Sequence, residues 1–410
     1  MQIPRDLSRR MIDAVEPMPI VDVYERLVPE SRRVNQRVDL LAWLVASAGA
    51  ELQSLGLGSD EIQLLRDVDG SPDQRWALLN RYWPFLRTTN GGRMVLRVVW
   101  EFFGVENVDA KSWKDISAQM WRNTETGFYG SMLREWANVP YVLVDGPIEA
   151  AMKPTCVQVK GFDRLMRLNC LPEIEAWAQS LGRREVLTVE LLDTLIAQSV
   201  ERSVQQGAIA FKLGLLPEVS LPSEEEVAWA FGRVSRCENP NSPVDPALQT
   251  YIGHCLFRAF EKAQLPVQVH LSGSLGVDRL EELAHRYPKV RLVAGYMGSV
   301  HAYALAMLAR SLPNVSLALV EVWRFAPLLA RQTLRDWIHC VPSRKIVALG
   351  GGMAVVENIA IQAKILREEL ASLFAEMVAA GELDENDALM VVERLLYRNA
   401  LEDYGLPELT

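Results

Sequence analysis

The stretch VQVHLSGSLG, residues 267–276, decides the fold that the sequence predicts. It indicates a short buried strand that delivers His270, then a Gly/Ser turn, then a helix that begins near Asp278. Three further apolar strands are predicted after it, at 291–296, 315–322 and 345–350, with helical patterns between them. Such alternation is typical of a parallel sheet whose functional groups lie where the strands end. His270 is predicted to lie at such an end.

Four earlier segments complete a set of eight strands. They are predicted at 19–23, 140–145, 162–168 and 208–213. Eight is the number that closes a (β/α)8 TIM barrel. We therefore expect an α/β protein with one domain over residues 1–410 and a large helical cap, residues 31–138, inserted after the first strand.

The predicted cap is rich in tryptophan. It holds seven of the eleven tryptophans, and its apolar residues keep helical spacing, as in Leu40, Leu41 and Leu44. Two interpretations remain open. The indoles pack the cap onto the barrel, or one or two of them line a pocket for a flat or apolar ligand.

Composition limits the partners and the compartment. The formal net charge is −9, which argues against nucleic acid and anionic membranes as primary partners. The five cysteines are odd in number and have no CxxC spacing, which favours a reducing cytoplasm. The N-terminal segment has no apolar core typical of a signal peptide, and no run of 18 apolar residues exists. A small molecule or a peptide is the expected ligand.

From about residue 266 to 406 the chain resembles the amidohydrolase-related, metal-dependent hydrolase group of the amidohydrolase superfamily, near its uronate isomerase and decarboxylase branches. The segments that carry the resemblance are VQVHLSGSLG, LEELAHRYPKVRLV at 280–293, LPNVSLAL at 312–319, WIHCVPSRKIVALGG at 337–351 and YRNALEDYGL at 397–406. PIVDVYERL at 19–27 stands where the family has its first strand. The resemblance implies a barrel, a hydrolase activity and, by analogy, a possible homo-oligomer.

The sequence departs from the family at the metal ligands. The His-x-His that ends the family's first strand is replaced by Tyr24 and Arg26, and the histidine after the sixth strand by Tyr296. Gly351 stands where the family has an aspartate after the eighth strand. Only His270 keeps its identity, and Lys212 matches a lysine often found at the fourth strand.

These replacements predict a site without a metal. A catalytic zinc needs about three His, Asp, Glu or Cys ligands and an open position, and an arginine would repel a dication. The expected cofactor is therefore none. The alternative is one zinc or manganese ion in a rearranged site built from Glu25, His270 and Glu321.

The predicted site residues follow from this interpretation. His270 is the candidate general acid or base, and Lys212 the second catalytic candidate, either holding an anionic group or forming an ion pair with Asp22 or Glu321. Substrate-binding candidates at the strand ends are Arg26, Tyr24, Tyr296, Glu321 and Trp323. For Arg26 and the two tyrosines, the alternative is that they fill the emptied metal site.

Three functions remain open from the sequence. The first is a metal-independent hydrolase that cleaves an amide, lactone or related acyl bond in a small anionic or peptide-like substrate. The second is a catalytically inactive pseudoenzyme that serves as a binding or scaffold protein. The third is a hydrolase with the rearranged metal site. Fold alone does not choose among them.

Overall fold

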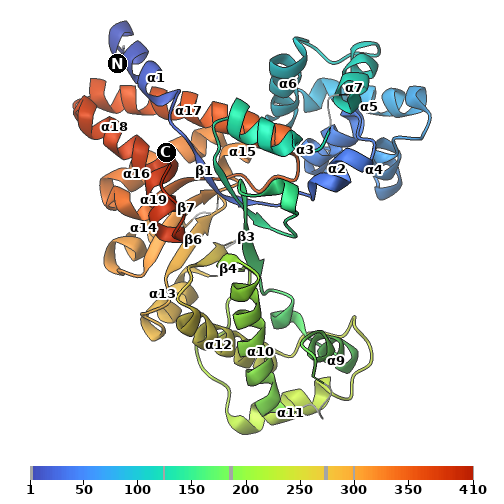
Figure 1. Ribbon diagram of the computed structural model, residues 1–410, viewed down its shortest axis with the longest axis vertical. Helices are drawn as coiled ribbons and strands as arrows, with labels where there is room; N and C mark the ends of the chain where they lie inside the picture. The colour runs from blue at the N-terminus through green and yellow to red at the C-terminus, as the bar shows by residue number, and fades with distance from the viewer. Residues whose placement is uncertain (1–2, 123–124, 184–187, 272–275, 299–300, 410) are drawn as a thin grey trace.

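A computed structural model describes residues 3–122, 125–183, 188–271, 276–298 and 301–409. Eight parallel strands form one sheet in sequential order, β1 to β8, with helices between them (Figure 1). The strands are β1 Val21–Glu25, β2 Tyr141–Asp145, β3 Cys156–Gly161, β4 Ala208–Leu213, β5 Val267–Leu271, β6 Leu292–Tyr296, β7 Val315–Val320 and β8 Ile346–Gly350. The predicted (β/α)8 TIM barrel is confirmed. The Gly/Ser turn predicted at 272–275 lies outside the described residues.

The seam between β8 and β1 is closed by the loop that follows β8. Gly352 N–H donates to the Tyr24 carbonyl at 2.9 Å, and Arg26 N–H donates to the Met353 carbonyl, also at 2.9 Å. The glycine-rich turn therefore joins the last strand to the first and brings both strand ends to one mouth.

Seven of the eight predicted strands are found within about two residues of their expected bounds. The third is wrong, because β3 precedes the predicted segment 162–168. Leu165–Arg167 form a 3₁₀ turn instead, and the buried Phe162 and Met166 pack into the core. Phe162 still donates its N–H to the Lys212 carbonyl of β4 at 3.1 Å, where the pairing of β3 ends. An apolar run alone does not distinguish a strand from a packed turn.

Helices flank the barrel and cover its outer face, and they also form parts of the connections at both of its ends. Those before β1 and after β2 are α1 Arg5–Val15, α9 Leu171–Ser180, α10 Val189–Gln205, α11 Glu224–Val234, α12 Pro246–Ala263, α13 Val277–Arg286, α14 Ala302–Ser311, α15 Val322–Phe325, α16 Pro327–Cys340, α17 Val356–Ala379, α18 Glu385–Glu393 and α19 Asn399–Tyr404. Thr188 caps α10, since its hydroxyl accepts from Leu191 N–H. No helix in the described ranges has the length and apolar character needed to cross a membrane.

The insertion after β1 forms a helical lobe to one side of the barrel (Figure 1). It comprises α2 Glu30–Asn35, α3 Leu40–Ser54, α4 Ser59–Arg66, α5 Pro72–Leu86, α6 Asn90–Phe103 and α7 Ser112–Arg122, and then the chain returns through α8 Phe128–Gly130 and the π-helical turn η1 Ser131–Trp136. The lobe has its own apolar core, in which Trp43 and Trp113 are buried, and Ile361 of α17 joins that core. Trp43 and Trp113 therefore stabilise the lobe itself.

Side chains alternate between the barrel interior and the helical layer. Val21, Ala210, Val293 and Ala318 share the interior cluster. Below His270 on β5, Gln268 donates to the Val23 carbonyl at 2.7 Å and to the Tyr404 hydroxyl at 2.9 Å. α19 thus seals the interior beneath the mouth.

Candidate functional site

Lys212 lies at the centre of the barrel mouth and pairs with a carboxylate that the sequence did not single out. Its Nζ is 2.5 Å from Oδ2 of Asp145, the last residue of β2. The two residues stand on either side of β3, where Gly161 leaves room, since a Cβ there would lie 3.1 Å from Asp145 Oδ1. The partners suggested from the sequence, Asp22 and Glu321, are wrong.

Tyr24 connects Lys212 to His270. Lys212 Nζ lies 5.1 Å from the centroid of the Tyr24 ring, and the imidazole of His270 meets the same ring edge-on at 4.2 Å between centroids. Gly295 on β6 pairs with His270 and gives it space, because a Cβ there would lie 3.0 Å from His270 Cδ2. The structure therefore brings together His270, Lys212 and Tyr24.

Burial and charge set the protonation of these three groups. Burial, then the positive charges of Lys212 and Arg26, lower the pKa of His270 to about 3, so its imidazole is neutral at pH 7. Burial raises the pKa of Tyr24 although Lys212 and Arg26 oppose it, so the phenol keeps its proton. Burial alone would lower the pKa of Lys212, but hydrogen bonds and charges from Asp145 and Tyr24 outweigh it and raise that pKa.

Arg26 and Glu321 form a second ion pair at the rim. Arg26 Nη2 donates to Glu321 Oε1, and Arg26 Nε donates to the Gly352 carbonyl at 3.2 Å. The Arg26 side chain is half exposed, whereas Glu321 is buried. Glu321 adopts a left-handed backbone with φ +58°, and its carboxylate packs against Gly352, where no Cβ would fit. Arg26 is therefore the cation of the mouth that faces solvent.

A buried pair of carboxyl groups, Asp22 and Glu25, lies behind the glycine turn. Asp22 Oδ1 accepts from the N–H groups of Tyr24 and Gly351 at 3.1 and 3.3 Å, and Glu25 Oε2 accepts from Met353 N–H. Burial first, and then Asp22 itself, raise the pKa of Glu25 well above its usual value, and burial also raises the pKa of Asp22. Each has one oxygen with no other donor, so a proton shared between them satisfies both.

The same pair explains the glycine at position 351. A Cβ on Gly351 would overlap Glu25 Oε1. The family's aspartate has no room here, since Glu25 occupies the space that its side chain would need.

Two predicted substrate-binding residues lie outside the mouth, which corrects the expectation for both. The Tyr296 ring faces the helical layer and packs edge-on against Trp337 of α16 at 5.6 Å. Trp323 is buried, and its indole N–H donates to the Ala348 carbonyl at 2.8 Å. Strand alternation explains Tyr296, because Gly295 takes the inward position.

The donor set of the mouth does not fit the family's metal. Among the described residues, no three His, Cys, Asp or Glu side chains lie together in a way that could hold a metal ion. Glu25 and His270 belong to different groups, since Glu25 faces Asp22 and Met353 whereas His270 faces Tyr24. Glu321 is engaged by Arg26. The rearranged site of Glu25, His270 and Glu321 therefore finds no support in this geometry.

Known structures share this architecture over almost the whole chain. The uronate isomerase of Thermotoga maritima superposes with a TM-score of 0.80 at 15% identity and covers 98% of each chain. The glucuronate isomerase of Caulobacter crescentus gives 0.79 at 16% identity, over 100% of this chain and 96% of its own. A Lactobacillus casei protein provisionally described as a metal-dependent hydrolase gives 0.64 at 12% identity, over 96% and 97%.

The fold is thus the one seen in these uronate isomerase structures. No protein-family model matches the chain, and no curated protein matches it in sequence. At this identity the likeness establishes the fold, and the activity has to be argued from the site.

Proposed function

We propose that the barrel mouth is the active site of a metal-independent enzyme that acts on a small carboxylate. The observation that carries the proposal is the contact of Lys212, Tyr24 and His270 at the ends of β4, β1 and β5, where barrels of this kind place their chemistry. Two cations, Lys212 and Arg26, lie beside the Tyr24 ring at the mouth. A carboxylate or a developing oxyanion is the group that they would stabilise.

Each side chain has a role that its protonation state allows. Lys212 and Arg26 hold the negative charge, and Tyr24 donates its phenolic proton to a developing oxyanion while Lys212 stabilises the phenolate that results. His270 is neutral, so it accepts a hydrogen bond from substrate or water. This set suits cleavage of an amide, lactone or related acyl bond. It also suits proton transfer on a uronate, the substrate class named for the structural neighbours.

A binding protein without catalysis is the second candidate. Asp145 already neutralises Lys212, and Glu321 already neutralises Arg26. The low pKa of His270 makes its imidazole a weak base. Both observations favour a mouth whose charges are held in stable ion pairs over a mouth that performs catalysis.

Proton NMR on the purified protein with a chelator present separates the two candidates. The substrates to mix with it are glucuronate, galacturonate, their lactones and a set of N-acyl amino acids. Turnover by wild type that is lost in Lys212→Met and kept in Lys289→Met, an exposed lysine after α13, supports the enzyme. Binding without turnover supports the binding protein. The absence of both for every carboxylate would refute the proposed site.

A further inference from the structure

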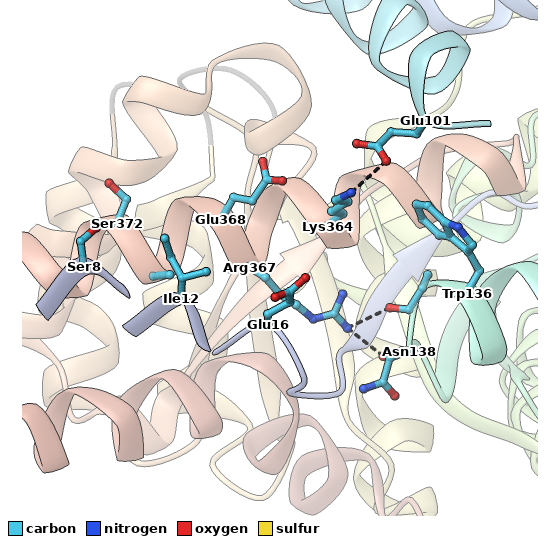
Figure 2. Close-up of a pocket in the computed structure, with 12 residues that line it drawn as sticks. Ser8, Ile12, Glu16, Glu101, Trp136, Asn138, Lys364, Arg367, Glu368 and Ser372 are labelled. Carbon is cyan, nitrogen blue, oxygen red and sulfur yellow. Dashed lines mark hydrogen bonds and ion pairs between the residues drawn. The ribbon is translucent and has the colours of Figure 1, made fainter. Parts of the chain in front are cut away.

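A pocket of about 640 Å³ lies on the outside of the barrel between α1, α6, η1 and α17 (Figure 2). Its buried wall touches Met18 and Asn138, which come just before β1 and β2. It therefore lies at the N-terminal ends of the strands, whereas Lys212 lies near their C-terminal ends. Its volume is in the range of small-molecule sites.

Most charges around this pocket are already paired. Lys364 Nζ lies 2.8 Å from Glu101 Oε2. Arg97 is 3.0 Å from Glu101 and 2.7 Å from Glu368. These contacts neutralise the two acidic residues of α6 and α17 that line the pocket, Glu101 and Glu368. Arg367 and Glu16 remain, with opposite charges.

Arg367 is a buried cation that has only neutral partners. Its Nε donates to the Met18 carbonyl at 2.8 Å, and its Nη2 donates to the carbonyls of Ala137 and Asn138 at 2.9 and 3.0 Å. It forms no ion pair within the described part of the chain, and its Nη1 has no hydrogen-bond acceptor there. Figure 2 shows the guanidinium on the pocket wall, with both dashed lines leaving one nitrogen.

Glu16 and the apolar wall complete the site. Glu16 is exposed at the end of α1, and its charge acts on Arg367 although the two form no ion pair. Trp136, the last residue of η1, keeps 41% of its surface exposed, and Ile12 keeps 48%. Both line the pocket, and π-helical turns are frequent at functional sites.

We propose that this pocket binds a free α-amino acid with an apolar side chain. Its carboxylate would bind Arg367 Nη1, its ammonium would bind Glu16, and its side chain would lie on Trp136 (Figure 2). A simple anion meets repulsion from Glu16, and a simple cation meets repulsion from Arg367. A zwitterion satisfies both charges at once, and Trp136 adds apolar or cation–π contact.

Isothermal titration calorimetry with phenylalanine on the full chain tests this proposal. We expect a dissociation constant of about 1 mM or lower. Phenethylamine, which lacks the carboxylate, and 3-phenylpropionate, which lacks the ammonium, should each bind at least about tenfold more weakly. Equal binding by either analogue would overturn the proposal, as would the absence of phenylalanine binding at 10-fold that concentration, about 10 mM.

Amino-acid substitutions show whether the measured heat of phenylalanine binding comes from this pocket. Glu16→Gln should weaken phenylalanine binding about tenfold. Asp13→Asn, an exposed acid on the same helix that does not line the pocket, should leave it unchanged. Trp136→Ala should also weaken it, and both Glu16 and Trp136 are exposed in the structure. Loss in Lys212→Met with no loss in Glu16→Gln would place the ligand in the barrel mouth and refute the proposal.

Discussion

The carboxyl pair behind the mouth predicts an unusual dependence of stability on pH. Asp22 and Glu25 are fully buried, and Glu25 has a pKa well above 4.5 because of burial and of the neighbouring Asp22. At a pH between the ordinary pKa of a glutamate and the raised pKa of Glu25, the folded protein holds a proton that the unfolded chain has released. The free energy of unfolding therefore falls as the pH rises through this window.

Glu25→Gln isolates this effect, since the amide keeps the shape of the side chain and cannot titrate. One proton corresponds to about 1.4 kcal/mol per pH unit. The stability of the variant relative to wild type should thus improve by up to about that amount per unit from about pH 5 upward. The Gln amide nitrogen can still donate to Asp22, and its amide oxygen can still accept from Met353 N–H, so the variant keeps both contacts of Glu25.

Urea unfolding at pH 5, 6 and 7 measures this slope. Glu225→Gln replaces an exposed carboxylate at the start of α11 and is the matched control. Its free energy of unfolding should change with pH as that of wild type does. If the stability of Glu25→Gln also runs parallel to wild type across this range, the two carboxyl groups do not share a proton, and the reasoning fails.

Three further substitutions test the mouth and its supports. Lys212→Met should weaken carboxylate binding measured by calorimetry, and lower unfolding stability by about 1–3 kcal/mol because Asp145 loses its partner. Gly351→Asp, which restores the family's residue, should cost about 1–3 kcal/mol in urea unfolding because Glu25 fills the space, and should not create zinc binding in elemental analysis. Trp323→Phe should cost about 1–3 kcal/mol by leaving a β8 carbonyl unpaired, with calorimetric ligand affinity unchanged.

The barrel was predictable from sequence because its strands are short apolar runs separated by helical patterns. The exception is β3, which has the sequence CVQVKG. Its polar residues Gln158 and Lys160 interrupt the apolar run by which the other strands are recognised. The neighbouring segment at 162–168 is more apolar and therefore predicts a strand, whereas its apolar residues Phe162, Leu165 and Met166 are buried in the core. Hydrophobicity indicates burial more reliably than it indicates sheet pairing.

The site was predictable only in part, for reasons of geometry. His270, Lys212, Tyr24, Arg26 and Glu321 do gather at the mouth, because each stands near the end of a strand. Tyr296 and Trp323 also stand there but face outward, and counting alternate residues from the inward Gly295 would have shown this for Tyr296.

Asp145 was missed although it ends β2, a position that is itself a signal. Its pairing with Lys212 spans two strands and requires Gly161 between them, which spacing along the chain does not reveal. The contact between Asp22 and Glu25 was missed because residues three apart on a regular strand point to opposite faces. Here the register of β1 against β2 shifts between them, and the two carboxyl groups meet.

The barrel mouth is proposed to bind a small carboxylate without a metal. Elemental analysis of protein purified without chelator, combined with calorimetric titration of glucuronate before and after EDTA dialysis, tests it most directly. We predict well under one equivalent of zinc or manganese per chain, and an affinity that EDTA does not change and that Lys212→Met reduces. About one equivalent of metal per chain, with glucuronate binding lost when the metal is removed and restored when it is returned, would show that the mouth depends on a metal.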